Sequence, residues 1–67
     1  MQKVKSGNIA EIGYSGKTLT VQFKSGVKWS YFDVPEHVHR ELMGAESVGG
    51  YFARHIRNEF KGKKHEE

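Results

Sequence analysis

The hydrophobic period of this chain changes at Asp33, and that change limits what the chain can fold into. Up to Phe32, apolar residues alternate with polar ones in short runs, which is the period of a half-buried β-strand. After Asp33 the apolar residues recur every fourth position, the spacing of one face of a helix. The sequence therefore predicts strands followed by helices in one small α+β domain.

Short gaps divide the first half of the chain into three predicted strands. The gaps contain Ser15-Gly16 and Ser25-Gly26, and glycine reaches the positive φ of a tight turn without steric cost. Two tight turns in succession predict a three-stranded antiparallel β-meander. The predicted strands span residues 8–14, 18–24 and 27–32.

Alternation also predicts which way each side chain points. In residues 8–14 it places Ile12 and Tyr14 on one face and Ile9 on the other. In the third run it places Trp29 and Tyr31 together on one face. Residues 8–14 form one edge of the predicted meander, where another strand could pair.

The first predicted helix follows the meander. Asp33 is its expected N-cap, Pro35 falls in its first turn, and Glu36 stands three residues after the cap. Gly44 is expected to end it.

The second predicted helix packs beside the first on one face of the sheet, giving the order β-β-β-α-α. Ser47 is its expected N-cap. Because glycine destabilises a helix interior by about 1 kcal/mol, the effective start is expected at Gly50 or Tyr51. Its core stripe is Val48, Phe52, Ile56 and Phe60.

Length and cysteine content narrow the class of protein. A chain of 67 residues buries only about 60% of its surface, so we expect one domain over residues 1–67, with a core at 8–60 and a charged, partly disordered tail at 61–67. Such a thin core is compatible with a homo-oligomer. The absence of cysteine and of a signal segment favours a cytoplasmic protein. No apolar run is long enough for a membrane span.

Catalysis and metal binding find little support. No cysteine, nucleophile elbow or Ser/His/Asp set with a recognisable context is present. His37 and His39 are two residues apart and would point to different sides of a helix. A metal site joining His39 to His55 is conceivable, but surface histidines explain the pattern better. The expectation is a non-enzyme with no metal and no cofactor.

The charge is compatible with an anionic partner, although solubility of a small domain explains a net charge of this size better. The formal net charge is +3 and the isoelectric point is about 9.3, with basic ends flanking an acidic segment at 33–46. Arg54, Arg57, Lys61 and Lys64 are spaced three and four residues apart, so they form one stripe if the second helix continues through the tail.

Aromatic residues and a helix start complete the candidate site. Trp29, Tyr31 and Tyr51 could stack on bases if they reach solvent. Ser47 and Gly49 open the second helix, where backbone N–H groups can bind an anion, although a simple N-cap explains them as well. The candidate ligand-binding residues are Trp29, Tyr31, Ser47, Gly49, Tyr51, Arg54, Arg57 and Lys61.

The stretch from Trp29 to Arg57 resembles the KTSC domain family. The aromatic pair Trp29-Ser30-Tyr31 leads into Phe32-Asp33-Val34-Pro35, and Ala45-x-Ser47-x-Gly49-x-Tyr51-Phe52 and Ile56-Arg57 follow. Trp29 stands where the family usually has tyrosine. The resemblance implies a small bacterial or phage domain that also occurs at the C-terminus of some lysyl-tRNA synthetases. By this resemblance, the motif positions of the family correspond to Trp29, Tyr31, Phe32, Pro35, Ser47, Gly49, Tyr51, Phe52 and Arg57.

Three functions remain open from the sequence. The first is a non-catalytic module for nucleic acid, RNA being favoured by the tRNA-enzyme association. The second is an oligomer that binds or sequesters a small signalling nucleotide, such as a cyclic dinucleotide, between subunits. The third is a protein-interaction module that uses the acidic segment or the edge strand.

Overall fold

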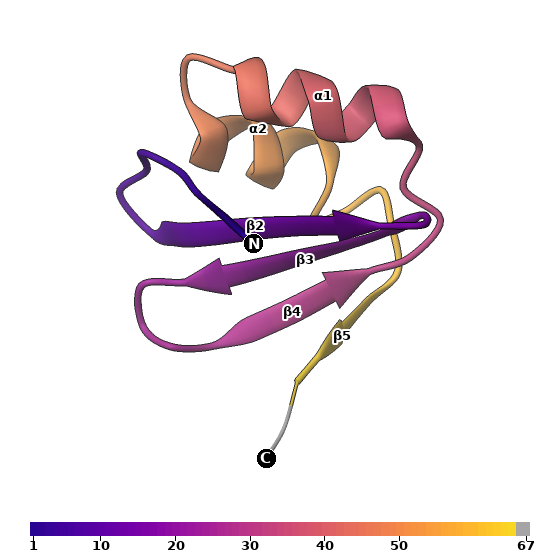
Figure 1. Cartoon of the computed structure of the whole chain (residues 1–67), viewed down its shortest axis with the longest axis horizontal. Coiled ribbons are helices and arrows are strands. Elements are labelled where there is room, and N and C mark those ends of the chain that lie inside the picture. The colour runs from indigo at the N-terminus through magenta and orange to yellow at the C-terminus, as the bar shows by residue number, and fades with distance from the viewer. Residues whose placement is uncertain (66–67) are drawn as a thin grey trace.

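The chain forms an antiparallel sheet with two helices on one side of it (Figure 1). The structure, a computed structural model, describes residues 1–65. Its elements are β1 (Gln2–Lys3), β2 (Ile9–Ser15), β3 (Thr18–Phe23), β4 (Lys28–Tyr31), α1 (Glu36–Gly44), α2 (Val48–His55) and β5 (Gly62–Lys64).

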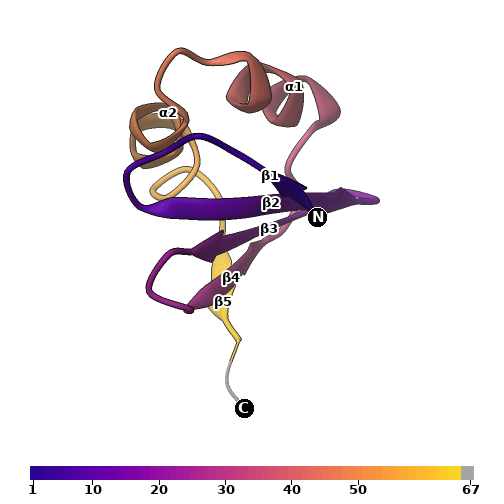
Figure 2. The ribbon, with the colours of Figure 1, turned by 60° about the vertical axis from the view of Figure 1, so that its left-hand side comes forward.

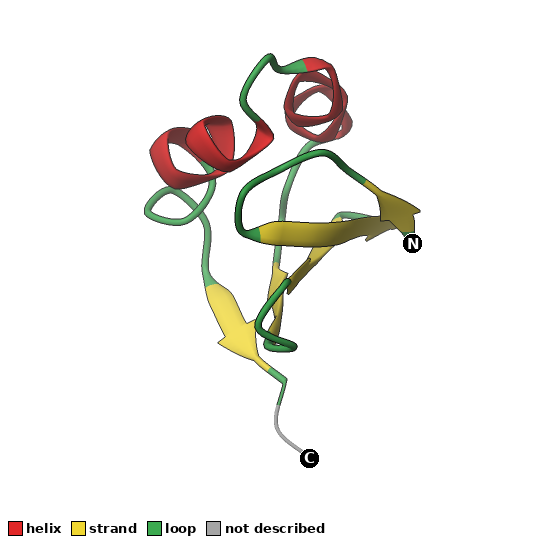
Figure 3. Ribbon diagram, turned by 90° about the vertical axis from the view of Figure 1, so that its left-hand side faces the viewer, coloured by secondary structure: helices red, strands yellow, loops and turns green. Residues whose placement is uncertain are grey.

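The predicted α+β class and the central meander are confirmed, but the sheet has five strands rather than three. The strand order is β1-β2-β3-β4-β5, and every neighbouring pair is antiparallel. β1 pairs with β2 through Gln2 and Lys3, so β2 is not the open edge that was expected. β5 adds the opposite edge, beyond β4 (Figure 3).

The two hairpin turns form where the glycines predicted them. Gly16 has φ 61° and Gly26 has φ 97°, both in the region that favours glycine. Ser15 pairs directly with Thr18, which leaves Gly16 and Lys17 as a two-residue turn.

The predicted facing of β2 is wrong at one residue. Its register shifts between Ile9 and Glu11, a β-bulge that adds one residue to the strand. The bulge turns Ile9 to the same side as Ile12, and both side chains are buried. Simple alternation cannot anticipate this, because a bulge changes the phase of the strand.

The core lies between the helices and the inner face of the sheet. Beyond the bulge, β3 alternates as predicted, with Leu19 and Val21 fully buried. Leu42 from α1 and Phe52 from α2 pack against them. The buried hydrophobic residues are Ile9, Ile12, Leu19, Val21, Tyr31, Val34, Leu42, Val48, Phe52 and Ile56.

Asp33 does not cap α1. Its φ is 58°, and Val34 follows it into the core, where the Val34 N–H donates to the Lys17 carbonyl. The Tyr14 hydroxyl donates to the Val34 carbonyl at 2.6 Å. The N-cap is Pro35, which has no side-chain acceptor, and α1 begins at Glu36. The left-handed turn at Asp33 is what redirects the chain from β4 to the helix.

Ser47 caps α2 as expected, and its Oγ accepts from the Gly50 N–H at 3.1 Å. Helical geometry starts at Val48, two residues earlier than the glycines suggested. The helix also ends earlier, at His55. The N–H groups of Ile56 and Arg57 both donate to the Phe52 carbonyl, and the chain then turns toward the sheet. Phe60 therefore lies outside the helix and is only partly buried.

The tail was expected to be partly disordered, but residues 62–64 form β5. The Phe32 N–H donates to the Lys61 carbonyl and the His65 N–H to the Lys28 carbonyl, which flank the strand at both ends. β5 thereby pairs the edge of β4, whose polar backbone groups would otherwise need water. The expected tail at positions 66 and 67 lies outside the described residues.

Candidate functional site

Four of the eight predicted site residues line a single groove between the sheet and α2. This Trp29 groove has a volume of about 320 Å³. Trp29 and Tyr31 come from β4, Gly49 from the start of α2, and Arg57 from the turn after its end. Its lining residues are Asn8, Phe23, Trp29, Tyr31, Gly49, Phe52, Ala53, Arg57 and Gly62.

Packed aromatic rings form the base of the groove. The Phe52 ring meets the Tyr31 ring edge to face at 5.4 Å and 76°, and the Phe23 ring at 5.7 Å and 71°. Tyr31 and Phe52 are each 3% exposed. Trp29 is stacked on Tyr31 with a centroid distance of 6.1 Å and an angle of 19°. Trp29 is only partly buried, so it is the aromatic ring of this stack that a ligand can reach.

Arg57 supplies the positive charge of the groove. It is exposed and makes no ion pair with any acidic side chain in residues 1–65, where the one salt bridge joins Arg40 to Glu36. Burial raises the pKa of the Tyr31 phenol, and the positive charge of Arg57 partly offsets that rise. The guanidinium thus acts on the buried aromatic group from the rim of the groove.

Glycine allows α2 to approach the loop before β2. A Cβ on Gly49 would lie 2.9 Å from Asn8 Oδ1 and 3.1 Å from Ser6 Oγ. Ser6 Oγ in turn donates to Asn8 Oδ1 and accepts from the Ile9 N–H. Figure 2 shows this loop rising from the sheet toward α2. Gly49 therefore has a packing role, and the groove wall forms because of it.

Three other predicted residues lie together, but elsewhere. Ser47, Tyr51 and Arg54 line a separate depression of about 320 Å³ with His55. The Tyr51 hydroxyl donates to Glu41 Oε1 at 3.1 Å, and its ring lies 4.5 Å from that of His55. Burial, the hydrogen bond and the negative charge of Glu41 all raise the pKa of Tyr51. These contacts are internal to the two helices.

The predicted cationic helix stripe does not form. α2 ends at His55, so Arg54 is the only member of the stripe that lies on the helix. Arg57 belongs to the turn, Lys61 precedes β5, and Lys64 lies within β5. Lys61 lines neither of these two depressions. Likewise, of the backbone N–H groups at the start of α2, that of Gly50 already donates to the Ser47 side chain.

Five of the residues that line the groove were not among the predicted site residues: Asn8, Phe23, Phe52, Ala53 and Gly62. Phe52 was assigned to the core alone, and Phe23 was not considered, although its alternation with Val21 indicated the inner face. Gly62 was missed because the tail was expected to lack structure. A single glycine among the six charged or ionisable residues of the tail at 61–67 was the available signal.

Residues 1–65 contain no cluster of three or more His, Cys, Asp or Glu side chains that could hold a metal ion. His39 stacks on Tyr14 at 4.6 Å and 6°, whereas His55 packs on Tyr51. The two histidines considered for a shared site thus have separate aromatic partners. Neither helix within the described residues is long and apolar enough to cross a membrane.

Comparison with known proteins finds the same fold in a solved structure. The crystal structure of a KTSC domain protein from Yersinia pestis superposes with a TM-score of 0.90 and 35% identity, covering 97% of this chain and 94% of that one. The KTSC domain model matches residues 5–60. A protein of Tsukamurella paurometabola is 32% identical over 63 residues and is covered to 94% of its length.

Other relatives are much longer proteins. A lysine–tRNA ligase of Trichormus variabilis is 47% identical over 45 residues, which is 67% of this chain. A lysine–tRNA ligase of Nostoc punctiforme is 38% identical over 61 residues, or 88% of this chain. The matched segments make up only 8% and 11% of those ligases.

Proposed function

Because the chain belongs to the KTSC domain family, which it shares with segments of lysine–tRNA ligases, we propose that the Trp29 groove binds single-stranded RNA without catalysis. One observation carries the proposal: the Trp29–Tyr31 stack lies in the same groove as Arg57, which has no ion-pair partner in residues 1–65. An accessible aromatic ring beside a cation is the combination that holds a base and its phosphate.

In this proposal each groove residue has a defined role. The indole of Trp29 stacks on a base and also on Tyr31, whose ring Phe52 supports edge to face. Arg57 binds the adjoining phosphate, since its planar guanidinium offers two parallel donors. Asn8 also lines the groove, where its side-chain amide can reach a base edge. The base provides most of the buried area, and the phosphate provides the salt dependence.

The single tryptophan makes the proposal directly testable. Trp29 is the only tryptophan in the chain, so its fluorescence reports on the groove alone. Titration with an RNA oligonucleotide at about 50 mM salt, where phosphate contacts are strong, is expected to quench it saturably. Raising the salt to about 200 mM is expected to weaken binding. The absence of both quenching and an anisotropy change of labelled RNA at the lower salt would contradict the proposal.

A small anionic nucleotide is the second candidate for the same groove. The volume of about 320 Å³ falls at the lower end of small-molecule sites, and its polar groups are few. In this alternative a second copy of the chain closes the open side of the groove. Native mass spectrometry of protein purified from cells separates the two ideas, because it reports the assembly and any retained nucleotide together.

A further inference from the structure

The open face of the sheet carries a second set of cations beside an exposed aromatic ring. Figure 1 shows both helices on the other side of the sheet. Two depressions on the open face share Lys64 and His65. One has a volume of about 410 Å³ and the other of about 520 Å³. We call the open-face patch the set Lys28, Ser30, Phe32, Lys63 and His65.

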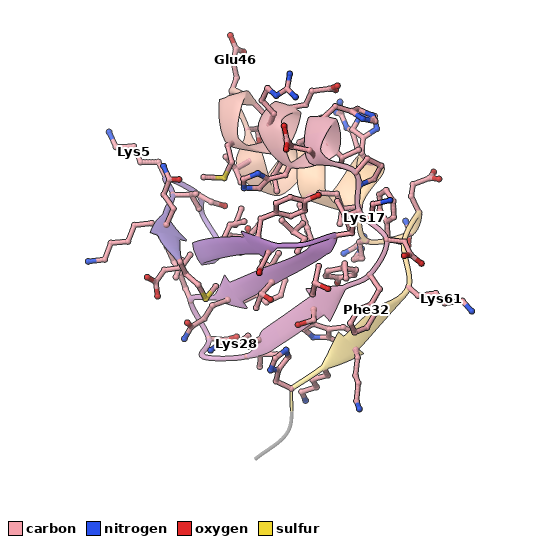
Figure 4. The ribbon with its side chains drawn as sticks, turned by 45° about the vertical axis from the view of Figure 1, so that its right-hand side comes forward. Lys5, Lys17, Lys28, Phe32, Glu46 and Lys61 are labelled. Carbon is pink, nitrogen blue, oxygen red and sulfur yellow. The ribbon has the colours of Figure 1, made fainter. Side chains whose placement is uncertain are left out.

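The charge of this patch has one sign. Among residues 1–65, no aspartate or glutamate lines either depression. Phe32 is 41% exposed, although it directly follows a strand whose last two residues are buried. Figure 4 shows Phe32 at the end of β4 close to β5, with Lys28 at the start of β4. A ring that a base can stack on, next to cations that can hold phosphates, is the combination that suits a nucleic acid strand.

One member of the patch is held in place by the sheet. The His65 N–H donates to the Lys28 carbonyl, and its Nε2 lies 2.5 Å from Ser30 Oγ. Ser30 is 6% exposed and also lies within hydrogen-bonding distance of Thr20 Oγ1, at 3.3 Å. The imidazole therefore has a fixed orientation on the open face, which reduces the entropy lost when a ligand binds beside it.

β5 connects this patch to the Trp29 groove. In the β4–β5 register, Lys64 pairs with Trp29 and Lys63 with Ser30. Successive strand residues face opposite sides of a sheet, and β5 is the outermost strand. The distance between the two surfaces is thus only the thickness of one edge strand.

We propose that the open-face patch is a second phosphate-binding surface, onto which an RNA strand in the Trp29 groove continues around the β5 edge. This inference rests on the proposed function of the groove. It extends the RNA-binding surface beyond the groove. A short oligonucleotide occupies the groove alone, and a longer one also reaches Lys63 and Lys28.

The test compares two lengths of single-stranded RNA, about four and about sixteen nucleotides, the range covered by small single-strand-binding folds. The variant is Lys28→Gln with Lys63→Gln. The matched control is Lys3→Gln with Lys5→Gln, which removes the same charge at the far edge of the sheet, where Lys3 pairs with Glu11. Circular dichroism establishes that both variants fold.

Fluorescence anisotropy at several salt concentrations gives the readout. Each lost phosphate contact lowers affinity by about tenfold near 50 mM salt and reduces the slope of log K against log salt by about 0.7. We expect the Lys28/Lys63 variant to bind the long RNA with lower affinity and with a smaller salt slope than the wild type. We expect it to bind the short RNA as the wild type does. The Lys3/Lys5 control is expected to bind the long RNA with the wild-type salt slope.

Three results would overturn the inference. If the Lys28/Lys63 variant binds the long RNA as tightly as the wild type, the open-face patch makes no contact, and the groove proposal stands. If both lysine pairs weaken long and short RNA equally, only the overall charge matters. If the wild type binds neither length, the inference fails together with the proposed function.

Discussion

The ring of Tyr31 lies against the backbone of Gly62 so closely that a Cβ on Gly62 would sit 2.6 Å from Tyr31 Cε1. The two residues are register partners across β4 and β5. This contact brings β5 against the aromatic base of the Trp29 groove. Tyr31 therefore both forms part of the groove and determines how closely β5 can pair with β4.

Replacing Gly62 with alanine is therefore expected to destabilise the domain. The added methyl group overlaps a buried ring, and overpacking of this kind costs about 1–3 kcal/mol. In a domain of this size each kcal/mol lowers Tm by about 4–8 °C, which thermal unfolding followed by circular dichroism measures. Gly7→Ala is the control, since a Cβ there meets nothing within 4 Å. Equal melting of the two variants would show that β5 does not depend on the Gly62 contact.

Asp33 offers a test of the turn into α1. At φ 58° a Cβ is unfavourable, and aspartate tolerates this region better than alanine does. We expect Asp33→Gly to be at least as stable as the wild type and Asp33→Ala to be about 1 kcal/mol less stable than Asp33→Gly. Urea unfolding gives both values. If instead Asp33 were a helix cap, Asp33→Gly would be less stable than the wild type, by about a few tenths of a kcal/mol.

Ser47→Ala is expected to cost about 1 kcal/mol, because the Gly50 N–H loses its side-chain acceptor. Ser47→Asp restores an acceptor and should recover most of that loss. Ser25→Ala, in an exposed turn, is the control. An unchanged free energy of unfolding in Ser47→Ala would mean that the cap contributes nothing.

Tyr31 predicts a loss of stability at alkaline pH. Its pKa is raised above the ordinary value of 10.0, mainly by burial. The unfolded phenol therefore ionises first, and folding stability falls as pH rises from the unfolded pKa through the folded one. Between about pH 8 and about pH 11, the wild type should lose more unfolding free energy than Tyr31→Phe does. Lysine residues titrate in both proteins and therefore do not cause a difference between them. If the wild type and Tyr31→Phe lose the same unfolding free energy, ionisation of Tyr31 does not contribute.

Much of the inner layer could be predicted from local sequence. The alternation of β3, the glycine turns and the Ser47 cap depend on neighbouring residues, and all three are present. The bulge beside Ile9 and the strand at Gly62–Lys64 depend on partners distant in the chain. A lysine-rich edge strand has no apolar alternation by which to recognise it.

The residues of the candidate site also fall into those that local sequence predicts and those that it does not. Trp29 and Tyr31 share a face because strand period is local, so their proximity was predictable. Arg57 reaches them only because α2 ends at His55 and the chain turns, whereas helical extrapolation grouped it with Arg54 and Lys61. Ser47 and Tyr51 lie near Arg57 in sequence but line another depression.

Two neighbouring arginines give the most direct test of the central claim. Arg57 lines the Trp29 groove and Arg54 lines the depression beside Tyr51, while both are exposed and carry the same charge. Affinity for single-stranded RNA, measured by fluorescence anisotropy at about 50 mM salt, is compared between Arg57→Gln and Arg54→Gln. The account predicts a loss of about tenfold for Arg57→Gln and no more than a small change for Arg54→Gln. Equal affinities for the two variants, or a larger loss for Arg54→Gln, would contradict it.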